Sequence, residues 1–175
     1  MTHEELAENV YSTSYLRGTF HLRSGKISSE YFDKYQFESR PHLLKAVAEH
    51  LEPLLPDEFE LFAGLEIGGI PIAAALSLLT GIPAVYVRKK QKEYGTQKLA
   101  EGMDISGRKL LVVEDVITSG GQVITSVEDL RARGAVVNHA VCVIDRQSGG
   151  MEALKNNGVE LIPLFTMDEL KAYKK

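Results

Sequence analysis

The sequence is poor in cysteine and in long hydrophobic segments. Its one cysteine, Cys142, cannot form an intrachain disulfide; it lies in the apolar run His139–Ile144, which predicts a buried thiol and a reducing, cytoplasmic location. The longest apolar stretch, Ile70–Val85, is interrupted by two prolines and a glycine, which argues against a membrane-spanning helix. The acidic start, Met1–Glu5, lacks the basic and apolar regions of a signal peptide.

The sequence also has no excess of positive charge, since its formal net charge is −4, and this argues against nucleic acid as a main partner. One segment differs: between Arg88 and Lys98 there are five cations and one carboxylate, Glu93. A charge run usually marks a solvated surface. On an acidic chain, however, an isolated cationic segment after a strand also predicts binding of a small anion.

Several familiar catalytic motifs are absent. The sequence contains no Walker phosphate loop, no dinucleotide-binding glycine pattern, no serine-hydrolase elbow and no helical zinc-protease motif. Five scattered histidines and one cysteine give no zinc-ligand spacing. These absences exclude the simplest versions of those enzyme classes.

The 175 residues predict a single domain with a substantial core, because 44% of them are apolar and 25% are charged. Short apolar runs alternate with helical patterns, and this alternation predicts a parallel sheet with helices on both faces. The expected strands are 61–63, 84–87, 110–113, 136–144 and 159–165. The expected helices are 3–16, one beginning at Pro41 and burying Leu43 to Leu54, then 70–79, 123–133, 151–157 and one after Thr166; segments 19–22 and 31–35 are expected to be extended.

The most informative stretch follows the apolar strand Leu110–Val113. Two carboxylates, Glu114 and Asp115, come next, and a hydroxyl- and glycine-rich loop then enters a helix. Helix N-terminal amides and glycines predict a phosphate cradle from Thr118 to Gln122. Two acids beside it can accept hydrogen bonds from vicinal sugar hydroxyls and favour positive charge on the ring, so we expect a phosphosugar ligand. The alternative is that the two acids only cap a loop.

This stretch resembles the signature of the type I phosphoribosyltransferase family, whose members bind 5-phosphoribosyl 1-pyrophosphate (PRPP). Four further stretches narrow the resemblance to the orotate phosphoribosyltransferases: Phe20–Gly25, Gly68–Ala73, Arg88–Gly95 and Asp145–Gln147. The resemblance extends over nearly the whole chain from about Tyr15. It implies an α/β fold with a mostly parallel sheet flanked by helices, in a single domain with a small N-terminal hood (about 1–40) and a core (about 41–175).

The resemblance also implies which residues bind PRPP and act in catalysis. Glu114 and Asp115 are expected to hold the ribose hydroxyls, and the loop after them the 5′-phosphate, while a mobile basic loop closes over the pyrophosphate and reaches the partner's site in a homodimer. The implied catalytic residues are Lys92, Glu114 and Asp115. The implied PRPP-binding residues are Arg88, Lys89, Lys92, Tyr94, Glu114, Asp115, Val116, Ile117, Thr118, Ser119, Gly120, Gly121 and Gln122.

For the base, the resemblance implies contacts from Arg146, Thr118, Arg23, Tyr31 and Phe32. A guanidinium suits the carboxylate or carbonyl edge of orotate. Read alone, Arg146 would form a surface ion pair with Asp145, and the two aromatic residues would be ordinary core residues. The implied cofactor is Mg²⁺, bound through substrate and water near the two acids, with no dedicated protein metal site.

Three positions depart from the family pattern. Tyr94 stands where a histidine is common, and a phenol is neutral at pH 7, so it can offer only a hydroxyl hydrogen bond. Gly68 stands where many members carry a lysine, which removes one pyrophosphate cation, and Arg23 replaces an early lysine with a different geometry. These changes concern efficiency and loop closure more than reaction class.

The implied reaction is transfer of phosphoribose from PRPP to orotate, giving orotidine 5′-monophosphate and pyrophosphate in pyrimidine (UMP) synthesis. Two alternatives stay open: a purine phosphoribosyltransferase, and a non-catalytic ligand-sensing regulator on the same fold. Arg146 and the Arg23 region favour orotate, and the N-terminal residues, roughly the first 18, contain no DNA-binding helix-turn-helix. We expect small-molecule substrates, with neither nucleic acid nor membrane as a partner.

Overall fold

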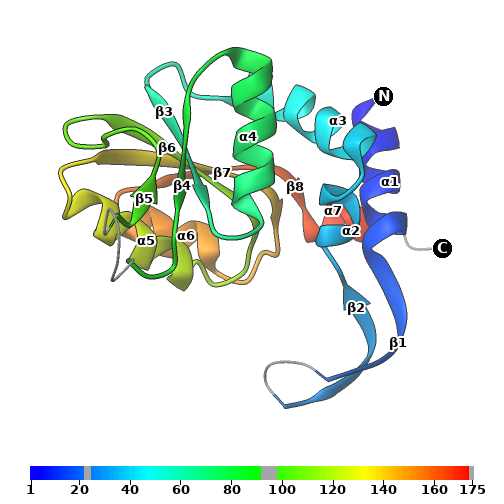
Figure 1. Ribbon diagram of the computed structural model, residues 1–175. Coiled ribbons are helices and arrows are strands. Elements are labelled where there is room, and N and C mark those ends of the chain that lie inside the picture. The colour runs from blue at the N-terminus through cyan, green and yellow to red at the C-terminus, as the bar shows by residue number, and fades with distance from the viewer. Residues whose placement is uncertain (22–24, 92–97, 174–175) are drawn as a thin grey trace.

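The computed structural model describes residues 1–21, 25–91 and 98–173. Figure 1 shows a sheet with helices on both sides and, at its right, a smaller N-terminal part whose hairpin projects away from the body. The sheet has six strands in the order β5-β4-β3-β6-β7-β8, and all neighbours are parallel except β4 and β5. This confirms the expected α/β fold with a mostly parallel sheet.

The strands agree closely with the apolar runs of the sequence. Their bounds are β3 Leu61–Leu65, β4 Ala84–Val87, β5 Ala100–Glu101, β6 Lys109–Ile117, β7 Val136–Asp145 and β8 Glu160–Thr166. β4 has the predicted bounds, whereas β6 extends four residues beyond the predicted end at Val113, because Glu114 to Ile117 stay paired with β7. The two-residue β5 was not predicted, since so short a strand carries no periodic signal.

The helices of the core are α3 Pro41–Leu51, followed by the short 3₁₀ helix η1 Glu52–Leu54, then α4 Gly69–Thr80, α5 Gly121–Arg131, α6 Gly150–Asn156 and α7 Met167–Lys171. The predicted capping box of Thr166 and Glu169 does begin α7. Leu54 was wrongly predicted to be buried: α3 ends before it, and the side chain is 40% exposed.

Two hydrophobic clusters cover the two faces of the sheet, because alternate side chains of a strand point to opposite sides. Leu111 and Val113 of β6 pack in the cluster with α3 and α4, and Leu110 and Val112 pack in the cluster with α5 and α6. The predicted buried thiol of Cys142 is confirmed, on the α5 side. All four residues Leu110–Val113 are buried, as their continuous apolar run predicted.

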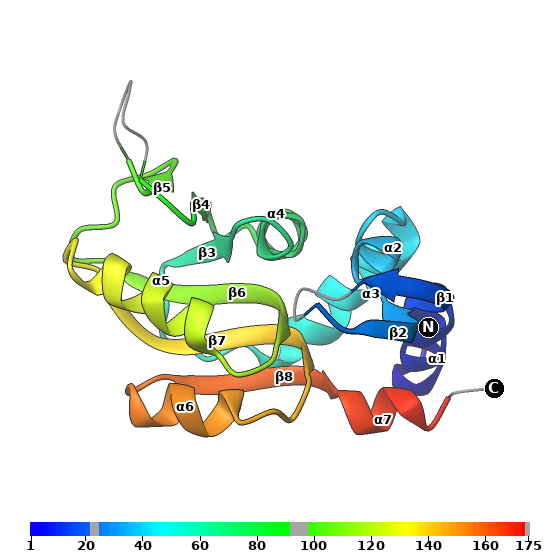
Figure 2. The ribbon, with the colours of Figure 1, turned by 90° about the horizontal axis from the view of Figure 1, so that it is seen from below.

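The N-terminal part consists of α1 His3–Ser14, the antiparallel hairpin of β1 Tyr15–His21 and β2 Ile27–Phe32, and α2 Tyr35–Glu38. Leu6 and Val10 of α1 and Phe37 of α2 belong to the same cluster as the α3 face of the sheet. Figure 2 shows this part lying beyond the ends of β6, β7 and β8. The prediction of extended backbone through Tyr35 was wrong at its end, since Tyr35 begins α2.

Of the helices in the described ranges, none has the length and apolar character that crossing a membrane requires.

Candidate active site

The carboxyl ends of β6 and β7 bring two predicted site residues together. The parallel register pairs Ile117 with Asp145, so Thr118 and Arg146 follow neighbouring strand ends. The backbone N–H of Arg146 donates to the carbonyl oxygen of Ile117 at 2.9 Å, which fixes this end of the sheet. Ligands of open parallel sheets bind at such an edge.

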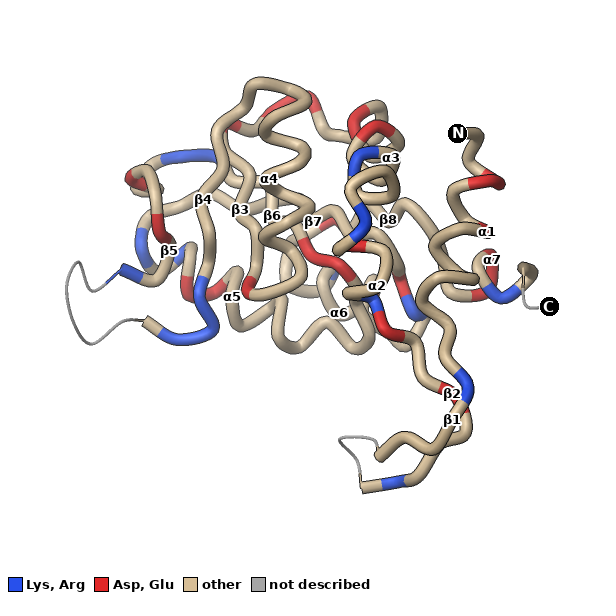
Figure 3. Tube along the Cα trace, turned by 45° about the vertical axis from the view of Figure 1, so that its right-hand side comes forward, with Lys and Arg blue, Asp and Glu red and all other residues tan. Residues whose placement is uncertain are grey.

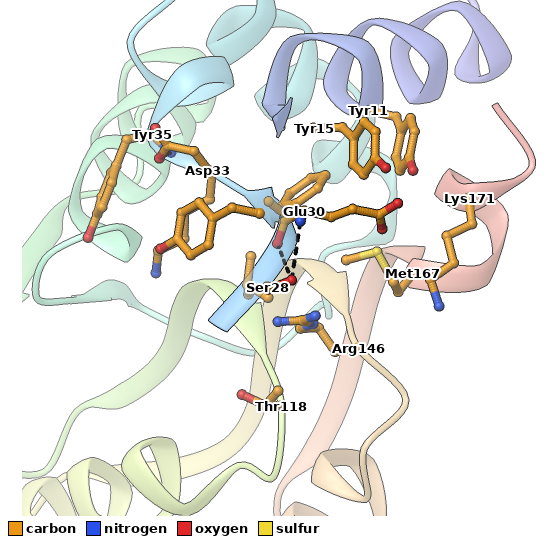
Figure 4. A pocket seen from close by; sticks show the side chains of 14 residues that line it. Tyr11, Tyr15, Ser28, Glu30, Asp33, Tyr35, Thr118, Arg146, Met167 and Lys171 are labelled. Atoms are coloured by element: carbon orange, nitrogen blue, oxygen red, sulfur yellow. Dashed lines mark hydrogen bonds between the residues drawn. The ribbon is translucent and has the colours of Figure 1, made fainter. Parts of the chain in front are cut away.

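A cavity of about 550 Å³ lies between this edge and the N-terminal part. It contains four of the five residues predicted to contact the base; the fifth, Arg23, lies outside the described residues. In Figure 4, Arg146 and Thr118 face β2 from the sheet side, while Met167 and Lys171 approach from α7. The lining residues are Tyr11, Tyr15, Ser28, Glu30, Tyr31, Phe32, Asp33, Lys34, Tyr35, Val116, Thr118, Arg146, Met167 and Lys171.

The cavity tests the alternatives that Tyr31 and Phe32 are ordinary core residues and that Arg146 forms an ion pair with Asp145. Tyr31 is 45% exposed and its ring stacks on Phe20 with centroids 5.4 Å apart, so it is not a core residue. Phe32 is half-buried and packs partly against the core as well as lining the cavity. No ion pair joins Arg146 to Asp145 within the described residues, and Asp145 Oδ1 instead accepts the backbone N–H of Gln147 at 2.9 Å.

The predicted phosphate cradle is a short exposed turn at the start of α5. Thr118 and Ser119 are exposed, and Gly120 has φ +78°, a backbone conformation that favours glycine. A Cβ at Gly120 would also lie 3.3 Å from the carbonyl oxygen of Gly150. The first N–H groups of a helix have no partner within it, and here Gly121 and Gln122 are open to solvent. Such a helix start suits a phosphate.

The predicted acid pair lies within β6 and is buried. Asp115 has 0% exposure; its Oδ1 accepts the Val116 N–H at 2.5 Å, and its Oδ2 lies 2.5 Å from the ammonium of Lys34. Glu114 Oε1 accepts the backbone N–H of Asp115 at 2.9 Å. Asp115 therefore forms a buried ion pair with Lys34, the residue before α2. The alternative that the two acids only cap a loop does not predict this ion pair.

A third carboxylate, Glu38 of α2, is buried beside this pair. Burial, followed by repulsion from Asp115, raises the pKa of Glu38 to about 9, and the same two causes raise the pKa of Glu114 to about 9. Burial alone would lower the pKa of Lys34, but the carboxylate of Asp115 outweighs this and raises it. Asp115 is therefore the carboxylate that Lys34 neutralises, while both glutamates favour the protonated form near neutral pH.

Lys34 and Glu38 were not predicted from the sequence. The only available signal is that a lysine and a glutamate stand four residues apart, which places them one helical turn apart. In a short polar segment this spacing is typical of a solvated surface. Their burial comes from the way α2 meets the end of β6, which local sequence does not encode.

The turn between β3 and α4 lies against the acid pair. A Cβ at Gly68 would fall 1.5 Å from Asp115 Oδ2, and one at Gly69 would fall 2.1 Å from the carbonyl oxygen of Val113. No side chain fits at Gly68 while Asp115 keeps this position. This gives a steric reason for one of the departures from the family pattern noted above.

The cations after β4 are not part of this cavity. Arg88 Nε donates to Glu101 Oε1 of β5 at 3.0 Å, and Lys89 is exposed. β3 lies between β4 and β6, and Figure 3 shows these cations on the side of the sheet away from the β1–β2 hairpin. Neither residue lines the cavity, and Lys92 and Tyr94 lie outside the described residues.

A magnesium ion is implied by the family, and the donor set near the acid pair is compatible with it. Glu114 and Asp115 offer the hard oxygen atoms that Mg²⁺ prefers, and Mg²⁺ commonly takes one or two carboxylates together with substrate phosphates and water. Within the described part of the chain, no group of three or more His, Cys, Asp or Glu side chains could hold a metal ion.

Comparisons with known proteins agree with this geometry. Residues 36–166 match the family model described as "Phosphoribosyl transferase domain". The orotate phosphoribosyltransferase of a Nocardioides species is 52% identical over 167 residues, which cover 95% of this chain and 93% of that protein. The orotate phosphoribosyltransferase of Methanocella arvoryzae is 42% identical over 171 residues, which cover 97% and 98% of the two chains.

Similarity in structure is equally extensive. A crystal structure of orotate phosphoribosyltransferase from Mycobacterium tuberculosis H37Rv aligns with a TM-score of 0.87 at 30% identity, and the alignment covers 96% of this chain and 98% of that one. The family model covers most of the chain, and the similarity in sequence and in structure extends over nearly all of it. The chain therefore belongs to the phosphoribosyltransferase family, among its orotate phosphoribosyltransferases.

Proposed function

We propose that the protein transfers the 5-phosphoribosyl group of PRPP to orotate, giving orotidine 5′-monophosphate and pyrophosphate, a step of pyrimidine nucleotide synthesis. The observation that carries the proposal is one cavity that joins Thr118 and Arg146 at neighbouring strand ends to Tyr31 and Phe32 of β2. An exposed helix start and a buried acid pair adjoin the same edge. This combination offers a phosphate site, a sugar site and a planar base site side by side.

The reaction exchanges two bonds at the anomeric carbon of the sugar. The bond from this carbon to the pyrophosphate oxygen breaks and its electron pair leaves with pyrophosphate, while a ring nitrogen of orotate forms the new bond and its proton passes to the departing pyrophosphate. Positive charge develops on the sugar ring, and the nearby carboxylate of Asp115 favours that charge. Orotate supplies its own nucleophile, so no covalent enzyme intermediate is needed.

Each group of residues in the cavity and at the adjoining sheet edge has its own task. The turn at Thr118–Gly120 holds the 5′-phosphate with backbone N–H groups, while Glu114 and Asp115 orient the ribose. Arg146 pairs with the carboxylate or carbonyl edge of orotate, and Tyr31 lies along the ring. When Mg²⁺ is bound, held through substrate and water near Glu114 and Asp115, it neutralises the pyrophosphate.

A spectrophotometric assay of the purified protein with PRPP, Mg²⁺ and a panel of bases tests this function. We expect turnover with orotate and none with adenine, hypoxanthine or xanthine, because a guanidinium at the base edge selects an anionic ring. Turnover of a purine would make the protein a purine phosphoribosyltransferase. Binding of PRPP and orotate without turnover would make it a ligand sensor.

We also propose that the protein acts as a homodimer in the cytoplasm. α4 is apolar on nearly every side, yet only one side of it packs against the sheet, and Leu78 on it is 90% exposed. Ile67 and Tyr86 near the same helix are exposed as well. A second copy would cover this surface, and a basic loop from that copy would supply cations to the pyrophosphate.

Mixed dimers test the shared loop. Subunits carrying Lys92→Ala and subunits carrying Asp115→Asn are each expected to be nearly inactive alone. If the loop of one subunit serves the site of the other, a mixed dimer has one site with both defects and one intact site, and activity returns. Continued inactivity in mixed dimers, or a monomeric mass by analytical ultracentrifugation, would contradict the proposal.

A further inference from the structure

The hood contributes a charged pair to the acid site. Lys34 and Glu38 lie four residues apart, at the beginning and end of α2, and both reach Asp115 of β6. Figure 1 shows α2 above the point where the β1–β2 hairpin leaves the body. The contact therefore ties the hood to the sheet edge through charge as well as through the packing of Phe37.

The carboxylate of Asp115 is held from three directions. Val116 N–H donates to Oδ1, Lys34 contacts Oδ2, and Gly68 lies so close that any Cβ there would overlap Oδ2. Asp115 is fully buried, whereas the side chain of Lys34 is about one-third exposed and lines the cavity. Lys34 therefore contacts Asp115 and lines the cavity at the same time.

The buried carboxylate of Asp115 requires a cation at this point. Glu38, Glu114 and Asp115 are all buried, and within the described residues Lys34 is the cation paired with Asp115. Removing one partner from a buried ion pair leaves an uncompensated charge, which is strongly unfavourable. Without Lys34, the Asp115 carboxylate would lose the contact that fixes its Oδ2.

We infer that Lys34 is a positioning residue for the sugar: it holds the carboxylate of Asp115 in place, so that this carboxylate can accept a ribose hydroxyl of PRPP. The inference rests on the proposed function, and it concerns PRPP and not the base. Lys34 acts through Asp115, so its loss affects binding of the sugar before it affects binding of orotate.

The test compares Lys34→Met with Lys45→Met in steady-state assays. Methionine keeps most of the length of the side chain and removes its charge, and Lys45 is a 71% exposed lysine on α3 whose ion-pair partner is Glu49. We expect Lys34→Met to raise the KM for PRPP about tenfold or more and to change the KM for orotate by less than about twofold. Lys45→Met should match the wild type.

Two further variants separate positioning from general stabilisation. Lys34→Arg keeps a cation and is expected to recover most of the affinity for PRPP. Glu38→Gln alone replaces a carboxyl group that is already protonated near neutral pH, so it is expected to leave the KM for PRPP within about twofold of the wild type. A role of Lys34 limited to folding predicts instead that the KM values for both substrates change together with the melting temperature.

Binding of PRPP measured by calorimetry in the presence of Mg²⁺ separates failure of this inference from failure of the proposed function. Unchanged affinity for PRPP in Lys34→Met, or equal losses for both substrates, would overturn the role of Lys34 even if orotate is turned over. A wild-type protein that binds PRPP but converts no orotate would refute the proposed reaction. The calorimetric comparison of the two lysine variants still decides the inference in that case.

Discussion

The acidic and basic parts of the sequence that were both assigned to PRPP are organised very differently. The acid pair is built into β6 and covered by α2 and the β3–α4 turn, so Asp115 has fixed neighbours in Val116, Lys34 and Gly68. The described cations after β4 lie at the other side of the sheet, where Arg88 is occupied by Glu101. One part of the site is therefore preorganised within a single chain, and the other part, in the proposed homodimer, is supplied by the basic loop of a second subunit.

The largest effect is expected at the preorganised acid. Asp115→Asn preserves shape but removes the charge that faces the sugar, so we predict a fall in kcat/KM of about 10²–10³-fold in the orotate assay. Thermal unfolding should show that the variant remains folded. Asp57→Asn, on an exposed loop, is the matched control. A loss of less than about tenfold would mean that Asp115 does not serve the reaction.

A smaller loss is expected from the basic segment. Lys92→Ala should lower kcat by about 10²-fold with little change in orotate affinity, because its charge acts on the departing pyrophosphate. The control is Lys155→Ala, an exposed lysine on α6. An unchanged kcat, or a loss confined to the KM for orotate, would contradict the difference drawn between the two parts of the site.

Loss of the Arg146 contact to the base is expected to have a smaller effect than loss of Lys92. Arg146→Ala should raise the KM for orotate about tenfold or more, the cost of a lost charged hydrogen bond, and leave PRPP affinity nearly intact. Arg108→Ala, at the opposite end of β6, provides the control. Weakened PRPP binding with normal orotate binding would reverse the assignment of the cavity.

The smallest effect concerns pH and stability. Glu38 has a folded-state pKa of about 9 against an ordinary value of 4.5, so between these values the folded protein binds more protons than the unfolded chain. Stability from this group is present at low pH and is lost as pH rises across that range. Glu38→Gln should therefore flatten the fall in melting temperature between about pH 6 and pH 9, by about 2–4 °C.

Glu49→Gln is the control for that measurement. Glu49 is exposed on α3 and its pKa is lowered by the neighbouring Lys45, so it is ionised in both folded and unfolded states over this range. Its replacement should leave the slope unchanged. Identical slopes for the wild type and Glu38→Gln would show that Glu38 carries no extra proton when folded.

Much of the core could be predicted from the sequence because its strands are buried on both faces. A continuous apolar run such as Leu110–Val113 predicts a strand that is buried on both faces. The bounds of β4 were also predicted correctly. Prediction failed where tertiary contact overrides local pattern. β6 continues through two acids to Ile117 because β7 pairs with it, and the four-residue α2 carries no period that could reveal it.

The site residues also divide into those that the sequence could locate and those that depend on tertiary contacts. Thr118 and Arg146 could be located because strand ends of a parallel sheet meet at one edge, and the structure does place them together with Tyr31. Lys34 and Glu38 could not be found in this way, since nothing in a short polar segment indicates that it will cover a strand end some 80 residues later in the sequence.

The burial of Cys142 makes it possible to attach a fluorescent label to the hood alone. The thiol is inaccessible and burial raises its pKa well above the ordinary value, so maleimide reagents will leave the native chain unlabelled. A cysteine introduced at exposed Ser29 on β2 would then carry a fluorophore as the only label on each chain. Its emission would report directly on hairpin motion as substrates arrive, without any need to engineer the natural thiol away.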